Sequence, residues 1–232
     1  MRARVVPVTA VALLLTLTAA CTDGSATPDT PDTAPSASSS PVDDSTTEPP
    51  GLDPEHVMDP VGPRTGEVAI PDIVITSPET LDPETVEAIK ALDGVRGVEL
   101  ISTAQVVIEN RAFNVAAVNP ATYRNWTKLN VAESEEVWNR IAGGEAGLRE
   151  KAAELIPQDA NQFVTLGSTD DAKAVHVGAI ANTVVDIDAV VNTTWVDDLG
   201  LTRDNTLLVR TGTRAPQKLR KPIERLAGGA AV

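Results

Sequence analysis

The chain has 232 residues, and its 33 acidic and 19 basic side chains give a formal net charge of −14. This acidity argues against DNA or RNA as partners, because nucleic-acid binding relies on lysine and arginine side chains that neutralise phosphates. Aromatic residues make up only 3% of the sequence, so Val, Ile, Leu and Ala must supply the core of about one domain.

The N-terminus has the pattern of an export signal. Two arginines precede an apolar run over residues 5–20, which is short for a spanning helix of about 20 apolar residues. Cys21, the only cysteine, follows two alanines in a pattern that resembles the lipobox of bacterial lipoproteins, although Thr18 stands where that motif more often has leucine. We expect a signal peptide over residues 1–20 and acylation of the Cys21 thiol, with palmitate as a chain. Secretion with a free thiol is the alternative.

Residues 21–66 are rich in Thr, Ser, Pro and Asp and show no apolar periodicity. A segment of this composition cannot bury enough surface to offset its ordering entropy, so we predict a disordered acidic tether. Its negative charge should hold the folded module away from an anionic bilayer. His56 falls in this segment, and we expect it to be solvated rather than bound to a metal.

The folded module is expected to span residues 67–232 and to begin with a strand, a helix and a hairpin. Ile73, Val74 and Ile75 form an apolar run that Pro78 ends. The helix that follows should start at Pro83 with Asp82 as its N-cap and stop at Gly94. The hairpin strands are predicted at 95–109 and 113–118, with a tight turn at 110–111.

The remaining chain is predicted as helices followed by strands. A helical stretch runs from Asn119 to Trp126, and apolar periodicity places longer helices at 134–143, 148–155 and 216–226, the last with a kink or restart at Pro222. Strands are expected at 162–166, 172–181, 184–191 and 206–210, with a hairpin turn at 168–171 and a helical turn at 195–199.

This order of elements does not alternate regularly enough for a doubly wound parallel sheet. It predicts an α+β fold, with a ferredoxin-like βαβ-type sheet, helices on one side and a second small β-rich lobe.

Several segments resemble the extracytoplasmic domain of MacB/FtsX-type ABC transporter permeases, known as the MacB-like periplasmic core domain. They are residues 81–98, 117–123, 137–146, 175–181 and 207–210. The chain would be a stand-alone lipoprotein of actinobacterial type, because it shows no apolar run of spanning length after residue 21 and no P-loop. A similar module resembles the N-terminal region of some actinobacterial cell-wall hydrolases. The resemblance implies a non-catalytic domain that contacts other extracytoplasmic proteins.

The sequence offers little material for catalysis, a cofactor or a metal. His176 is the only histidine of the expected module and lies in a predicted strand, where a structural role is the simpler interpretation. Asp186 and Asp188 would share one strand face and could suit a cation or acid/base chemistry, but without Gly-spaced oxygen ligands a solvated strand face is the simpler interpretation. No serine has a nucleophile motif. We therefore expect no enzyme, no cofactor and no metal site.

Two groups of residues are candidates for an interaction surface. Trp126 and Arg124 form one, and Trp126 is expected to be partly exposed because polar residues surround it. Lys218, Arg220, Lys221 and Arg225 form the other, a basic patch on the last helix that would meet an anionic partner or an acidic cell-wall polymer. A solvated helix face is the alternative for the basic patch.

The sequence thus leaves two functional hypotheses. The first is a membrane-anchored lipoprotein on the extracytoplasmic face of the cell membrane, whose non-catalytic module binds or regulates an envelope protein such as an ABC-type permease or a cell-wall hydrolase. The second is a lipoprotein that binds a small ligand or a cell-wall glycan, and its basis would be a pocket beside an exposed aromatic such as Trp126.

Overall fold

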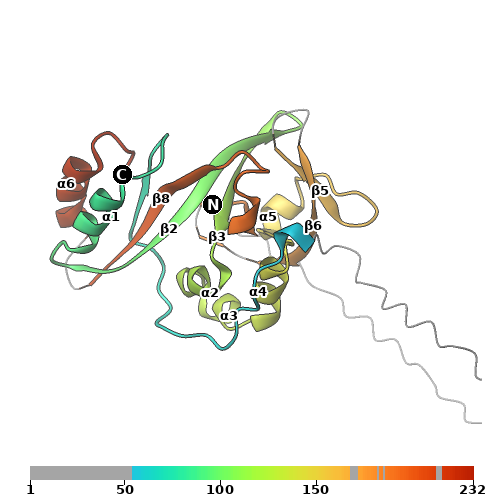
Figure 1. Ribbon diagram of the computed structural model, residues 1–232, viewed down its shortest axis with the longest axis horizontal. Coiled ribbons are helices and arrows are strands. Elements are labelled where there is room, and N and C mark those ends of the chain that lie inside the picture. The colour runs from blue at the N-terminus through green and yellow to red at the C-terminus, as the bar shows by residue number, and fades with distance from the viewer. Residues whose placement is uncertain (1–53, 168–171, 182, 185, 213–215) are drawn as a thin grey trace, which may run out of the picture. The chain divides into compact units, whose positions relative to one another are not determined.

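The computed structural model describes residues 54–167, 172–181, 183–184, 186–212 and 216–232. Its strands form one sheet in the order β1-β8-β2-β3-β7-β4-β6-β5 (Figure 1). Their bounds are β1 Ile73–Thr76, β2 Val95–Ile108, β3 Arg111–Val118, β4 Ala146–Leu148, β5 Phe163–Leu166, β6 Lys173–Ile180, β7 Ala189–Asn192 and β8 Thr202–Thr211. The helices are α1 Pro83–Lys90, α2 Pro120–Tyr123, α3 Leu129–Ala132, α4 Glu135–Ala142, α5 Glu150–Ala153 and α6 Pro216–Ala227, with 3-10 turns η1 Pro54–His56, η2 Arg124–Trp126 and η3 Thr193–Trp195.

The first half is a split βαβ unit, in which β8 lies between β1 and β2 and runs antiparallel to both. The crossover helix α1 begins as predicted, because an Asp82 carboxylate oxygen accepts a hydrogen bond from the backbone N–H of Thr85 at 3.3 Å. Gly94 has a φ of 104°, a conformation that favours glycine and turns the chain into β2. The predicted strand, helix and hairpin order is confirmed.

The long strand β2 continues into a hairpin with β3. Ile108 pairs with Arg111, so Glu109 and Asn110 are the two turn residues, with φ values of 46° and 62°. Two successive positive φ angles give the turn a twist that matches the flanking strands. The hairpin is confirmed, with its turn one residue earlier than predicted.

The second half adds β7, β4, β6 and β5 to the same sheet through parallel and antiparallel pairs. The strands expected in a small β-rich lobe are therefore continuous with the first half. The helix predicted over 148–155 is wrong at its start, because Leu148 lies in β4 and only Glu150–Ala153 is helical. All three residues of β4 are buried between β7 and β6, and this sheet pairing outweighs the helical spacing of the apolar residues.

Helices cover both faces of this sheet, and the predicted α+β class is confirmed. On one face, α1 and α6 pack on β1 and β8 through a cluster that includes Ile75, Ile89 and Ile223. On the other face, α2, η2, α3 and α4 pack on β2, β3 and β7 through a cluster that includes Tyr123 and Trp138. Helix α6 runs without interruption through Pro222, so of the two expected alternatives, a kink or a restart, the restart is wrong.

The chain is ordered earlier than the tether boundary at residue 66 predicts. His56 is only 5% exposed, and its ring stacks on Trp195 with 3.4 Å between ring centroids. The backbone then follows α4 and η2, with hydrogen bonds from Met58 N–H to Ala142 O and from Arg124 to Gly62 O. The expectation that His56 is solvated is therefore wrong, because the body offers an aromatic face and buried acceptors to this segment. We call residues 54–66 the strap.

The signal peptide, Cys21 and the rest of the predicted tether up to residue 53 lie outside the described residues. Among the helices that are described, none is both long enough and apolar enough to cross a membrane.

Candidate functional site

A groove of about 500 Å³ lies on the sheet face that carries α2 to α4, over the part formed by β1, β8 and β2. Val74 and Thr76 of β1 are exposed there, and they pair with Leu208 and Thr206 of β8. Because side chains alternate between the faces of a strand, the residues that line this groove point away from α1 and α6. Its polar lining residues are Thr76, Thr103, Gln105, Asn114, Asp186, Thr202, Asn205 and Thr206.

The floor of the groove is a row of hydroxyl groups that crosses three strands. The Oγ1 atoms of Thr103 and Thr206 are 2.8 Å apart, and Thr206 Oγ1 donates to Thr76 Oγ1 at 3.4 Å. Asn205 Oδ1 accepts from the backbone N–H of Thr103 at 2.8 Å. Thr103 Oγ1 also donates to Asn205 Oδ1 at 3.0 Å, and Thr206 is only 4% exposed, so within this row the exposed Thr76 hydroxyl is the one that can both donate to and accept from a ligand.

The rim opposite β1 is formed by β3 and the turn that precedes β7. Asn114 of β3 donates through Nδ2 to Asp186 O at 2.8 Å, and Thr183 Oγ1 donates to Ile187 O at 2.7 Å. Asp186 has a φ of 65°, which Asp and Asn tolerate better than most residues. The turn therefore holds the exposed Asp186 carboxylate at one end of the groove.

The composition of the groove restricts what it can bind. Among the described residues that line it, Asp186 is the only charged one, and none is an aromatic residue, histidine, cysteine, serine, lysine or arginine. A phosphate or carboxylate ligand would find no cation there, and a sugar ring would find no aromatic platform. The groove suits a polar ligand that is neutral or positively charged and that both donates and accepts hydrogen bonds.

Trp126 and Arg124 do not form the expected exposed surface. Trp126 is 8% exposed and Arg124 only 2%. The Arg124 guanidinium donates to Ala132 O at 2.7 Å and to Gly62 O at 3.1 Å, so it joins α3 to the strap. The prediction of a partly exposed Trp126 is wrong, because its neighbours along the chain are polar while its neighbours in space are the core of α2 and β2.

Beside Trp126, a half-buried carboxyl group lies on β2. Burial raises the pKa of Glu99, and hydrogen bonds from Thr122 and Trp126 oppose this shift without cancelling it. Thr122 Oγ1 donates to Glu99 Oε1 at 2.5 Å. This contact ties α2 to the sheet.

The basic residues of α6 are exposed, as expected. Arg220 is paired, because its Nε lies 2.9 Å from Glu224 Oε1 and its Nη2 donates to Val232 O at 2.8 Å. Lys218, Lys221 and Arg225 form no ion pair with any described residue. We call these three residues the basic stripe.

The two aspartates expected on one strand face are separated by the structure. Asp188 forms an ion pair with Arg149 and accepts from the backbone N–H of Asn114 at 2.9 Å. Asp186 lies on the groove rim, in the turn before β7. Within the described part of the chain, no group of three or more His, Cys, Asp and Glu side chains is arranged to hold a metal ion.

His176 belongs to a partly buried polar cluster with Glu145 and Arg140 that the sequence did not predict. Its Nδ1 lies 2.7 Å from Glu145 Oε1, while Glu145 Oε2 lies 2.7 Å from Arg140 Nε. Burial by itself raises the pKa of Glu145, but the hydrogen bonds from Arg140 and His176 outweigh it and lower the pKa below its usual value. The Phe163 ring packs edge-on against His176.

The sequence also gave no sign that His56 would meet Thr194 and Asp198, 138 and 142 residues further on. His56 Nδ1 lies 3.1 Å from Thr194 Oγ1, and Nε2 lies 3.0 Å from Asp198 Oδ2. This arrangement superficially resembles a nucleophile, a base and an acid. However, the Thr194 hydroxyl donates its single proton to Asn192 Oδ1 at 2.6 Å, so it does not donate to the imidazole. The contacts therefore fasten the strap to η3.

The groove itself left a weak signal in the sequence. Thr103 and Gln105 are polar residues at a spacing of two within an apolar strand, and Thr206 falls between apolar residues in β8. Such alternation indicates a polar strand face. It does not indicate which strands bring their polar faces together, because β1 and β8 are more than 120 residues apart in the chain.

No protein-family model matches the chain, and no curated protein matches it. Among solved structures, the chain is similar to the periplasmic region of MacB from Actinobacillus actinomycetemcomitans, with 12% sequence identity and a TM-score of 0.36 over 67% of this chain and 83% of that one. It is also similar to the extracellular domain of the noncanonic ABC-type transporter YknZ from Gram-positive bacteria, with 16% identity and a TM-score of 0.36 over 67% of this chain and 93% of that one. Both are partial similarities.

Proposed function

We propose that this protein is a lipid-anchored extracytoplasmic module that catalyses no reaction and binds an extended segment of another envelope protein in the groove. The observation that carries the proposal is the lining of the groove, with its row of threonine hydroxyls, its amides and one carboxylate. The anchor is supported by the apolar run that ends at Cys21, and the class of partner by the resemblance to permease and hydrolase modules.

A polypeptide backbone is the ligand that best matches this lining. An extended peptide presents N–H and C=O groups in turn along its length, and the accessible side chains of Thr76, Gln105 and Asn114 can bond to both. Val74, which is 41% exposed, borders the polar floor and can contact a small apolar side chain of the ligand. The Asp186 carboxylate favours a Lys or Arg side chain at one end of the bound segment.

The glycan hypothesis loses the feature on which it was based. It required an exposed aromatic beside a pocket, whereas Trp126 is buried and none of the described residues that line the groove is aromatic. A sugar would have to bind through hydroxyls and amides alone. Binding of a peptidoglycan fragment remains an outcome that the experiment below can detect.

The anchor is tested separately from the groove. Metabolic labelling with radioactive palmitate should label the chain and not its Cys21→Ser variant, and the N-terminal peptide should carry the mass of an acylated Cys21. A chain that retains residues 1–20 and takes up no palmitate would contradict the anchor.

The groove is tested by photo-crosslinking in intact membranes. A benzoylphenylalanine placed at Thr202, on the groove wall, should crosslink to a protein segment, and the same probe at the exposed Thr165 of β5 should not. A synthetic peptide that copies the crosslinked segment should bind the purified chain. Asp186→Asn should weaken this binding about tenfold, since a hydrogen bond between charged groups contributes roughly 1.5–3 kcal/mol. The matched control is Asp59→Asn, an exposed aspartate outside the groove.

Two results would contradict peptide binding in the groove. One is equal crosslinking from Thr202 and Thr165, which would indicate non-specific contact. The other is crosslinking of Thr202 to peptidoglycan fragments and to no polypeptide, which would favour the glycan hypothesis. Because Asn adopts the backbone conformation of residue 186 as readily as Asp, the Asp186→Asn variant should fold.

A further inference from the structure

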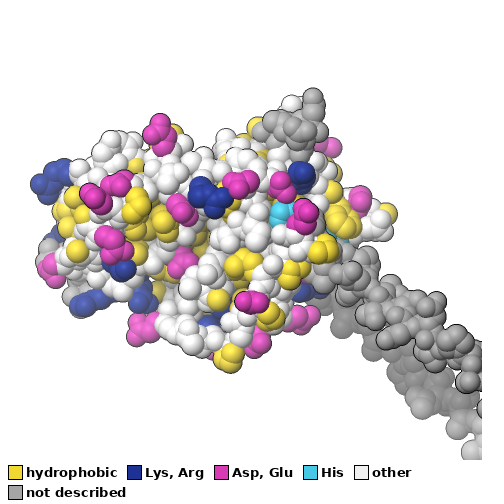
Figure 2. Space-filling view, viewed as in Figure 1, with side chains coloured by type: hydrophobic (Ala, Val, Ile, Leu, Met, Phe, Trp, Pro, Cys, Tyr) yellow, Lys and Arg dark blue, Asp and Glu magenta, His cyan; other side chains and the backbone are white. Residues whose placement is uncertain are grey.

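Among the helices that the structure describes, α6 carries the largest group of cations without an ion pair to a described residue, the basic stripe. Lys90, Arg140, Arg149, Arg203, Arg210 and Arg220 each form an ion pair with a nearby carboxylate. Lys218, Lys221 and Arg225, which form none with a described residue, are spaced three and four residues apart and therefore lie along one side of α6. Figure 2 shows lysine and arginine side chains at the end of the molecule that carries α1 and α6.

The stripe is bordered by apolar surface. Leu226 is 37% exposed and Pro222 is half-buried, and both lie between the stripe and the buried residues Leu219 and Ile223. A cationic stripe beside exposed apolar side chains is the arrangement of helices that lie at a membrane interface.

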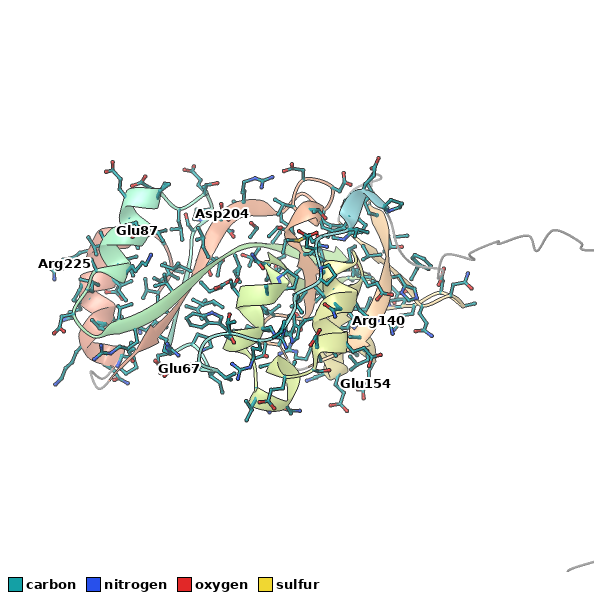
Figure 3. The ribbon with its side chains drawn as sticks, turned by 60° about the horizontal axis from the view of Figure 1, so that its bottom comes forward. Glu67, Glu87, Arg140, Glu154, Asp204 and Arg225 are labelled. Atoms are coloured by element: carbon teal, nitrogen blue, oxygen red, sulfur yellow. The ribbon has the colours of Figure 1, made fainter. Side chains whose placement is uncertain are left out.

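The position of α6 in the fold determines whether the groove would face toward or away from a surface that α6 contacts. Leu207 and Val209 of β8 point toward α6, whereas Thr206 and Leu208 of the same strand point into the groove. Helix α6 and the groove therefore lie on opposite faces of the sheet. Figure 3 shows Arg225 of α6 at one end of the molecule, with Arg140 and Glu154 toward the other.

The segment between Cys21 and the described module has the opposite charge to the basic stripe. Residues 22–53 contain seven acidic residues and no basic one, so they are repelled by anionic lipid headgroups. The lipid anchor, on which this inference rests, keeps the module within the length of that segment from the bilayer. An anionic headgroup layer is then the concentrated anionic surface that α6 meets.

We infer that α6 docks on anionic phospholipid headgroups through Lys218, Lys221 and Arg225, and that this contact turns the groove away from the bilayer. The three cations donate hydrogen bonds to the headgroup phosphates and are attracted by their negative charge, and Leu226 contacts the acyl boundary. Three cations near an anionic membrane surface correspond to roughly 10²-fold enrichment there. An interaction of this strength is sufficient because the lipid anchor already holds the chain at the membrane, which makes the contact between α6 and the headgroups intramolecular.

The experiment uses the full acylated chain, extracted from membranes and placed in lipid nanodiscs. One set of discs contains 30% phosphatidylglycerol and the other only phosphatidylcholine. Acylation occupies the Cys21 thiol, so a spin label attaches only to an introduced cysteine, either Gln217→Cys on α6 or Gln105→Cys in the groove. A nickel chelate carried on a lipid headgroup relaxes a label that lies close to the surface.

We expect nickel to relax the label at residue 217 at least threefold more in anionic than in neutral discs, and to leave the label at residue 105 unaffected in both. In anionic discs, the variant Lys218→Gln/Lys221→Gln/Arg225→Gln should lower the nickel-induced relaxation of the label at residue 217 to the level seen in neutral discs. The matched control Lys90→Gln/Lys151→Gln/Lys173→Gln removes three positive charges elsewhere and should keep it high. The three stripe residues are exposed, so their replacement leaves the core intact.

Equal relaxation of the label at residue 217 in the two kinds of disc would overturn the inference. An equal decrease of this relaxation in the two triple variants would overturn it as well. A soluble polyphosphate that displaces α6 from the discs at equimolar concentration would assign the stripe to an anionic polymer instead of lipid. The mass of the N-terminal peptide reports on the anchor by itself. An acylated chain whose α6 stays away from anionic lipid therefore contradicts this inference and leaves the proposed anchor intact.

Discussion

Replacing Glu145 with glutamine tests the partly buried cluster of Arg140, Glu145 and His176 that joins α4 to β6. The side chain of Glu145 is 8% exposed. Arg140 donates to both of its oxygens, from Nε to Oε2 at 2.7 Å and from Nη2 to Oε1 at 3.1 Å, and His176 Nδ1 lies 2.7 Å from Oε1. A hydrogen bond to a charged group contributes roughly 1.5–3 kcal/mol, and loss of one partner from a buried pair costs roughly 3–5 kcal/mol. The Arg140 side chain is 43% exposed and recovers water, whereas that of His176 is 11% exposed and does not. We therefore expect Glu145→Gln to lower the free energy of unfolding by about 3 kcal/mol at pH 5.

The effect should depend on pH in a definite direction. Hydrogen bonds from Arg140 and His176 hold the pKa of Glu145 below its usual value in the folded chain, despite the opposing effect of burial. A carboxyl group with a lowered pKa stabilises the folded state fully above its unfolded pKa, about 4.3, and this contribution is lost as pH falls through the folded pKa. The difference between the original chain and Glu145→Gln should therefore shrink from pH 5 to pH 3.

Urea unfolding followed by tryptophan fluorescence measures this difference, because all three tryptophans are buried. The control is Glu154→Gln, which alters an exposed glutamate and should change stability by less than about 0.5 kcal/mol at either pH. A Glu145→Gln difference under about 1 kcal/mol at pH 5, or one that is the same at pH 3, would refute the role assigned to the cluster.

Three other substitutions test specific contacts. Asn192→Ala removes an amide that donates to His56 O, Ile141 O and Ala142 O. Unfolding experiments should show that the free energy of unfolding falls by about 3 kcal/mol, because these backbone oxygens lose their buried donor. A decrease below about 1 kcal/mol would show that the amide does not stabilise the fold through these contacts. Gly178→Ala places a Cβ 2.6 Å from Glu145 Cβ and should lower the melting temperature, whereas at Gly97 the nearest atom would be 3.6 Å away and the same change should have little effect. His56→Ala should release the strap, so limited proteolysis should cleave residues 54–66 at least tenfold faster while the rest of the body stays resistant; unchanged cleavage would show that the ring does not fasten it.

Local signals in the sequence identified most of the regular elements. The Asp82-Pro83 pair marked the start of α1, and the apolar stripe with Leu219 and Ile223 marked α6. These predictions succeed because caps and the 3.6-residue period are set within one or two turns of a helix. The prediction for residues 148–155 failed where Leu148 enters the sheet, because burial between two strands is a contact at long range.

The candidate site was predictable only in part. The exposed basic residues of α6 were found because a charged helix face is visible in the spacing of one segment. Trp126 was assigned to the surface from its polar sequence neighbours, and the structure buries it under α2 and β2. The groove was missed, because its polar residues come from β1, β2, β3 and β8 and meet only when these strands pair.

The sequence alone determined the acidic composition, the pattern of an export signal before Cys21 and the α+β order of elements, because each depends on residues close together in the chain. Tertiary structure decided that β8 is inserted between β1 and β2, that the strap is fastened at His56, and that a hydroxyl-lined groove faces away from α6. The physical reason is that strand pairing and buried polar contacts join residues more than 100 positions apart, and no local periodicity encodes which partners meet.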